Sequence, residues 1–157
     1  MPTVYLCEIN HEAYNLGRLL SVLATLQKKA HKRNESEKGL EGPGVVERYY
    51  GAASTALATV FGVLWKLHVH HFRKLEQSEK GRATAYHIRG RLAEIIGQFA
   101  PGGPGQPPRF PATLSLEAQG RFALGFYQQM AADRQAIREA KAKQIAAHQS
   151  PNIPDQE

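Results

Sequence analysis

Apolar residues recur at intervals of three and four along the first part of the chain, and this period constrains the fold more than any other feature. It matches one face of an α-helix over about residues 11–32, and we expect other elements to cover that face. The apolar face consists of Leu16, Leu19, Leu20, Leu23, Leu26 and Ala30. The opposite side carries Arg18, Thr25, Lys28, Lys29 and Lys32.

Two further long helices are predicted before residue 100. A polar loop over 33–44 and a short helical turn over 45–50, ended by Gly51, precede a helix over 55–77. The inward side of that helix consists of Val60, Phe61, Leu64, Leu67, His68, His71, Phe72 and Leu75. Its opposite side carries Lys66, His70, Arg73 and Lys74. The next helix, over 82–99, turns Ile88, Leu92, Ile95, Ile96 and Phe99 inward.

Residues 100–111 are rich in proline and glycine, so we expect an internal loop there, because proline removes backbone donors and glycine resists ordering. A last helix is predicted from about Ser115 to Ala147, bent or frayed at Gly120 and Gly125. Its inner face consists of Phe122, Phe126, Met130, Ile137 and Ala140.

No alternating strand pattern stands out, and the one short candidate is Thr3 to Cys7. The fold class expected is therefore all-α, a helical bundle of four to five helices with the Pro/Gly-rich loop before the last long helix. We expect one domain over 1–147 and a flexible tail over 148–157.

Composition excludes several classes of protein. The 157 residues are 42% hydrophobic and 22% charged, which is typical of a globular domain. The single cysteine, Cys7, excludes an internal disulfide framework and a cysteine-based zinc site. The sequence contains neither a run of about 18 apolar residues nor a signal peptide, so we expect a soluble, cytoplasmic protein without a membrane span.

Motifs for catalysis or cofactor binding are missing from the sequence. His68 and His71 are three residues apart, but a metal site needs a third converging ligand, so we interpret them as core or interface histidines. Ser54 lacks the Gly-x-Ser-x-Gly pattern of a nucleophile elbow, and no phosphate-binding Gly-x-x-x-x-Gly-Lys loop is present. We expect a protein that is not an enzyme and that holds no metal or cofactor.

Charge is the first functional signal, because 20 Lys and Arg residues against 14 Asp and Glu residues give a net charge of +6. Such a balance favours an anionic partner, and the basic helix sides would contact a phosphate backbone. A solvated helix face is the alternative interpretation. The candidate nucleic-acid-binding residues are Arg18, Lys28, Lys29, Lys32, Lys66, His70, Arg73 and Lys74.

Three stretches carry a resemblance to a known family. They are residues 11–19 (HEAYNLGRL), residues 47–54 (ERYYGAAS) running on to the pair His70-His71, and residues 110–122 (FPATLSLEAQGRF). In this order they resemble the C-terminal region of the large subunit of the type I-C CRISPR Cascade complex. The resemblance covers roughly residues 10–130, and its middle block is the most specific part.

The resemblance implies a non-catalytic small subunit of the effector complex, made from an internal start within the large-subunit gene. A truncated or excised domain of the large subunit is the alternative origin. Such subunits are helical bundles that line the backbone loaded with guide RNA and stabilise the displaced non-target DNA strand during R-loop formation. The implied partners are the Cascade backbone and large subunits, the CRISPR guide RNA complex and the non-target strand, with more than one copy per complex. The alternative is a protein-interaction scaffold that bridges effector subunits, with only incidental nucleic-acid contact.

Overall fold

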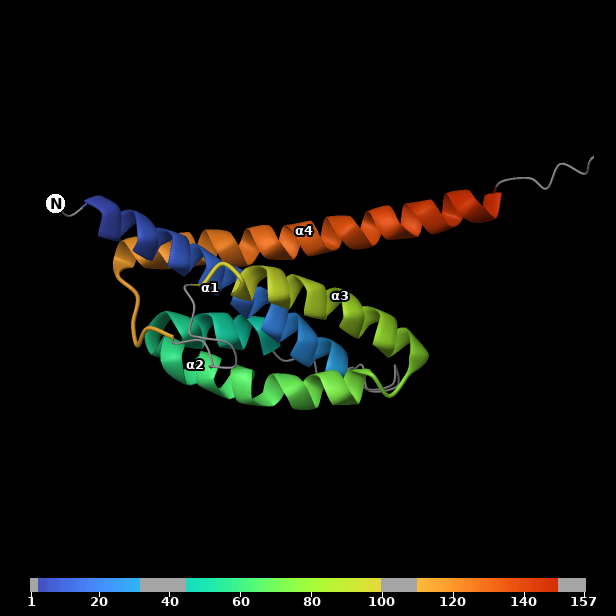
Figure 1. Ribbon diagram of the computed structural model, residues 1–157, viewed down its shortest axis with the longest axis horizontal. Helices are drawn as coiled ribbons and strands as arrows, with labels where there is room; N and C mark the ends of the chain where they lie inside the picture. The colour runs from blue at the N-terminus through green and yellow to red at the C-terminus, as the bar shows by residue number, and fades with distance from the viewer. Residues whose placement is uncertain (1–2, 32–44, 100–109, 150–157) are drawn as a thin grey trace, which may run out of the picture.

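The computed structural model describes residues 3–31, 45–99 and 110–149, and these residues contain helices but no strand. The four helices are α1 (Thr3–Ala30), α2 (Val45–Leu75), α3 (Glu79–Ile96) and α4 (Leu116–Gln149), as Figure 1 shows. The predicted all-α class is therefore confirmed. Most of the predicted Pro/Gly-rich loop and of the predicted tail lies outside the described residues.

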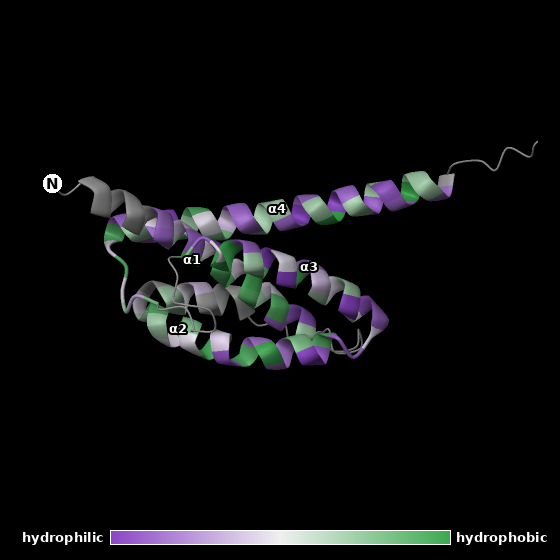
Figure 2. Cartoon of the chain, in the orientation of Figure 1, coloured by the Kyte–Doolittle hydropathy of each residue, from purple (hydrophilic) through white to green (hydrophobic). Residues whose placement is uncertain are grey.

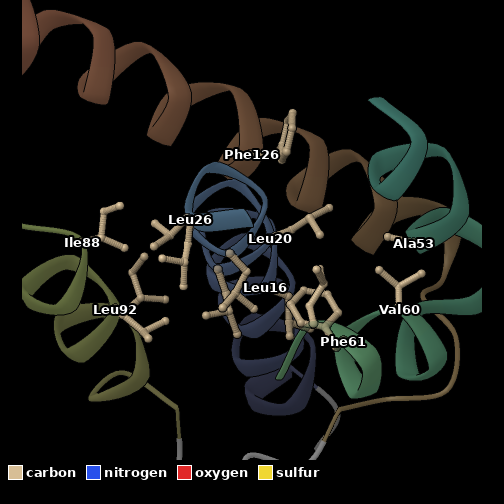
Figure 3. Close-up of a cluster of buried hydrophobic side chains, with 14 of the residues drawn as sticks. Leu16, Leu20, Leu26, Ala53, Val60, Phe61, Ile88, Leu92 and Phe126 are labelled. Atoms are coloured by element: carbon tan, nitrogen blue, oxygen red, sulfur yellow. The ribbon is translucent and has the colours of Figure 1, made fainter. Parts of the chain in front are cut away.

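Helix α1 is the central element of the bundle, because it contacts each of the other three helices. Figure 3 shows its leucines surrounded by Phe61 from α2, Leu92 from α3 and Phe126 from α4. Leu16, for example, is completely buried. Because three helices pack around α1, its buried surface extends well beyond the one-sided apolar stripe that the sequence predicts.

The starts of α3 and α4 are fixed by serine caps. The hydroxyl of Ser78 accepts a hydrogen bond from the backbone N–H of Gly81 at 3.0 Å, which places the start of α3 three residues before the predicted one. The hydroxyl of Ser115 accepts from the N–H of Ala118 at 3.2 Å, so the predicted start of the last helix is confirmed. Both caps satisfy a backbone donor that a helix start leaves without an intrahelical acceptor.

The first two helices differ from the prediction at their N-terminal parts. Helix α1 begins at Thr3, so the prediction of a helix start near residue 11 was wrong, as was the candidate strand Thr3 to Cys7. Helix α2 continues through Gly51 and is interrupted only at Ala56, where φ is −141° and ψ is 52°. The expected break is therefore real but lies five residues later, and α2 consists of two helical segments.

Two glycines allow α1 and α4 to approach more closely than residues with side chains would permit. A Cβ atom added to Gly17 would lie 2.0 Å from the carbonyl oxygen of Phe122, and one added to Gly125 would lie 2.0 Å from that of Tyr14. The predicted bend or fraying at Gly120 and Gly125 was wrong, since α4 is one helix across both. Gly125 instead allows the backbones of α4 and α1 to approach closely where the two helices cross.

The C-terminal half of α4 projects from the bundle. Asp133 is buried, whereas the side chains from 134 to 148 are exposed except for a half-buried Ala136. Figure 1 shows α4 diverging from α3 in this region, so no described helix covers it. Ile137, which is 48% exposed, and Ala140 were predicted to face inward, and that prediction was wrong because their helix has left its neighbours.

Candidate nucleic-acid interface

Three candidate residues form a row on the outer side of α2. Lys66, His70 and Arg73 are spaced by four and three residues and are all exposed, while Leu64 and Phe72 on the other side of the helix are buried. Side chains at these spacings lie above one another on a helix surface. We call these three residues the α2 cationic row, and their predicted position on one outward side is confirmed.

The C-terminal ends of α1 and α2 bring further cations together beside this row. The ammonium group of Lys74 donates a hydrogen bond to Nδ1 of His31 at 3.2 Å, which links the two helix ends. Lys28 and Lys29, in the last turn of α1, are exposed. Positive side chains at these positions also interact favourably with the negative C-terminal ends of the two helix dipoles. Part of their role is therefore to stabilise the helices.

The histidines next to this end are packed side chains. His71 is only 3% exposed, and its ring meets the ring of His31 edge-on with 5.2 Å between centroids. His68 is half-buried and its Nδ1 bonds to the carbonyl oxygen of Trp65. The interpretation of His68 and His71 as core or interface residues is consistent with these contacts. In the described ranges, no three His, Cys, Asp or Glu residues are placed to hold a metal ion.

Both contacting histidines favour the neutral state. Burial lowers the pKa of His71 below its ordinary value of 6.5, and the neighbouring His31 lowers it further. Burial also lowers the pKa of His31, and the adjacent charge of Lys74 adds to this effect. The accepting Nδ1 of His31 agrees with a neutral ring, because a protonated ring has no acceptor for Lys74.

We expect the stability of the protein to fall as the pH falls below the ordinary histidine range. A histidine whose folded pKa is lowered takes up its proton more readily in the unfolded chain. The stabilisation is therefore complete above about pH 6.5 and declines below it. The loss is at most about 1.4 kcal/mol per pH unit for the buried His71, and the exposed His31 contributes less because solvent screens its interactions. Denaturant unfolding between about pH 8 and pH 5 measures this slope.

His31→Gln combined with His71→Gln should flatten that pH dependence, whatever it does to stability at neutral pH. His87→Gln is the matched control, because it removes an exposed histidine of α3 that lies outside the contact between His31 and His71. Equal slopes for the wild type and the double variant would contradict the assignment.

Arg18 lies apart from these cations. Its side chain is 16% exposed and forms an ion pair with Glu94 at 2.8 Å, while its Nε donates to Gln129 at 3.0 Å. These contacts join α1 to α3 and α4, so they favour packing as the role of Arg18, and its proposed DNA contact stays a prediction. Lys32 lies outside the described residues.

Sequence reasoning missed the polar contacts that continue from Arg18. Gln129 donates to Asp133 at 2.8 Å, and Asp133 forms an ion pair with Arg91 of α3. A shallow hollow on α3 lies beside this pair and is lined by Tyr86, His87, Arg89, Gly90, Arg91 and Glu94. Both arginines and the glutamate of the hollow are engaged in ion pairs, so it does not present a free cationic surface.

Apolar side chains border the α2 cationic row. Val63, Leu67 and Val69 are 44%, 39% and 47% exposed. Leu67 was predicted to face inward, and that prediction was wrong because the residue lies at the edge of the buried side of α2. The same surface therefore offers apolar contacts to a protein as well as charge to a phosphate backbone.

The described helices thus define an all-α bundle that carries a row of cations on one surface helix, and none of them is long and apolar enough to cross a membrane. Residues 7–133 match the family model described as CRISPR-associated protein (Cas_Csd1). Because the match covers well over half of the chain, the protein belongs to this family of CRISPR-associated proteins. A comparison with curated proteins gives no match.

Proposed function

We propose that the chain is a non-catalytic small subunit of a type I-C CRISPR effector complex and holds the displaced non-target DNA strand on the α2 cationic row. The observation that carries this proposal is the outward row of Lys66, His70 and Arg73 on a chain of a CRISPR-associated family. The proposed partners are the backbone and large subunits with their guide RNA. The proposed location is the cytoplasm.

A small number of cationic contacts is enough for such a role, because of the energetics of strand exchange. Replacing a DNA duplex by a guide RNA–DNA heteroduplex is nearly balanced in free energy, so a few contacts to the displaced strand shift the equilibrium. The α2 cationic row extends about 10 Å along the helix axis, which is enough to meet several phosphates. Holding a strand without reading its bases requires a positive track, and needs no catalytic group.

Neutralising two members of the row should weaken binding to single-stranded DNA. For Lys66→Gln with Arg73→Gln, we expect the slope of log affinity against log salt to fall by about 1.4, since each lost phosphate contact removes about 0.7. The measurement is binding of labelled single-stranded DNA across a salt series. Lys74 is left unchanged because it also bonds to His31.

The control variant is Arg82→Gln with Arg121→Gln, which removes the same charge at exposed positions of α3 and α4. A slope that falls equally in both variants would show a general charge effect and contradict the proposed track. In the assembled complex, the row variant should keep the subunit bound but reduce R-loop formation.

The second candidate function is a scaffold that bridges effector subunits, and the exposed Val63, Leu67 and Val69 favour it. If neighbouring protein covers the row, the same Lys66→Gln, Arg73→Gln variant will be lost from the purified complex. The isolated chain would then bind single-stranded DNA no better than the variant does at low salt. Retention in the complex thus separates the two functions.

A further inference from the structure

The projecting part of α4, residues 134–149, lies outside both the bundle and the range matched by the family model, which ends at residue 133. We call it the α4 projection. It extends about 22 Å along the helix axis. Figure 2 shows hydrophilic residues alternating with apolar ones along it. A helix that stands clear of its own bundle is placed to contact a partner from more than one side.

The charges of the α4 projection are arranged in a row. Arg134, Arg138 and Lys141 are spaced by four and three residues and are all exposed, so they lie above one another on one side of the projection. The projection contains four Lys and Arg residues, counting Lys143, and one carboxylate. The resulting charge favours an anionic partner.

These cations are available for binding. The single carboxylate, that of Glu139, accepts a hydrogen bond from Gln135 at 2.9 Å, and no described ion pair involves Arg138 or Lys141. The guanidinium group of Arg134 contacts the sulfur of Met130 at 3.9 Å, which is a weak interaction. The row therefore differs from Arg89 and Arg91 of α3, whose charges are paired with Glu76 and Asp133.

We propose that the α4 projection is an arm that binds duplex DNA, lying in the major groove with Arg138 and Lys141 on the phosphates. A helix with its side chains is about 10–12 Å across and the major groove of B-DNA is about 12 Å wide, so the two fit. This inference goes beyond the proposed function, because it assigns a different form of nucleic acid to a different helix.

Other partners fit the α4 projection less well. A helix that docks on protein presents large apolar residues at every third or fourth position, but this one has only Ile137 and Ile145, eight residues apart with alanines between them. Duplex RNA has a major groove too deep and narrow for a helix. The charge and the diameter of the α4 projection therefore favour duplex DNA as its partner.

The test is Arg138→Gln with Lys141→Gln in the full chain, measured with duplex DNA across a salt series. We expect the salt slope for the duplex to fall by about 1.8, since each phosphate contact to B-DNA contributes about 0.9. Glutamine is a good helix former, so α4 should be preserved, which circular dichroism would verify. The matched control is Arg82→Gln with Arg121→Gln, which removes equal charge at exposed positions outside the α4 projection.

The proposal predicts that Arg138→Gln with Lys141→Gln lowers the salt slope for duplex DNA and leaves the salt slope for single-stranded DNA unchanged. An unchanged duplex slope, an equal loss in the control variant, or equal losses for duplex DNA, duplex RNA and single strands would each overturn it. Failure of the proposed function is seen separately, in the single-strand slope of Lys66→Gln with Arg73→Gln.

Discussion

Gly17→Ala is expected to lower the free energy of unfolding by about 2–3 kcal/mol, although alanine is the better helix former. The added methyl group would lie 2.0 Å from the carbonyl oxygen of Phe122 and 2.8 Å from the backbone nitrogen of Phe126. Backbone atoms of α4 cannot turn aside as a flexible side chain can. The two helices must therefore separate, and contacts of the buried leucines of α1 with α4 are lost.

Urea unfolding monitored by circular dichroism measures this loss. Gly120→Ala is the matched control on α4, because a Cβ atom there meets nothing within 4 Å. It should raise stability by about 0.5–1 kcal/mol, the usual gain from replacing glycine in an open helical position. A Gly17→Ala protein as stable as the Gly120→Ala protein would show that α1 and α4 do not cross at Gly17.

Asp133→Ala is expected to be the second large effect, with a loss of about 2–3 kcal/mol. Asp133 accepts a hydrogen bond from Gln129 and forms an ion pair with Arg91, and its own side chain is only 12% exposed. Alanine would leave a buried amide and a half-buried guanidinium group without their acceptor. Since this carboxylate joins α3 to α4, the α4 projection should also lose its fixed direction.

Glu139→Ala is the control for this prediction, because Glu139 lies on the same helix and is exposed, and among the described residues it bonds to the exposed Gln135. We expect a change below about 0.5 kcal/mol for this exposed pair. A double-mutant cycle with Arg91→Ala measures the coupling across the ion pair. Coupling near zero would mean that the pair does not join α3 to α4.

The periodic pattern predicted the number and approximate place of the helices because burial of an apolar face leaves a local trace in the sequence. Ser115 marked the start of α4 for the same reason, since a cap acts within one turn. The outward side of Lys66, His70 and Arg73 was likewise predictable, since residues three or four positions apart lie on successive turns of a helix and share a face whatever packs behind it.

The predictions from sequence that were wrong or incomplete share a different cause. Ile137 continues the inward pattern of α4 in sequence, yet it is exposed because α3 diverges from α4 at that point. Arg18 has the spacing of an outward cation, yet Glu94 and Gln129 enclose it from two other helices. In both cases the deciding residues are distant in the chain.

The sequence by itself thus determined the helices, the charge and the family to which the chain belongs, since each depends on neighbouring residues or on motifs in order. The tertiary structure alone decided that α1 is central, that Gly17 and Gly125 form a helix crossing, and that α4 projects with its cations uncovered. These features arise from helix packing, which depends on the complementary surfaces of separate helices and leaves no local period to read.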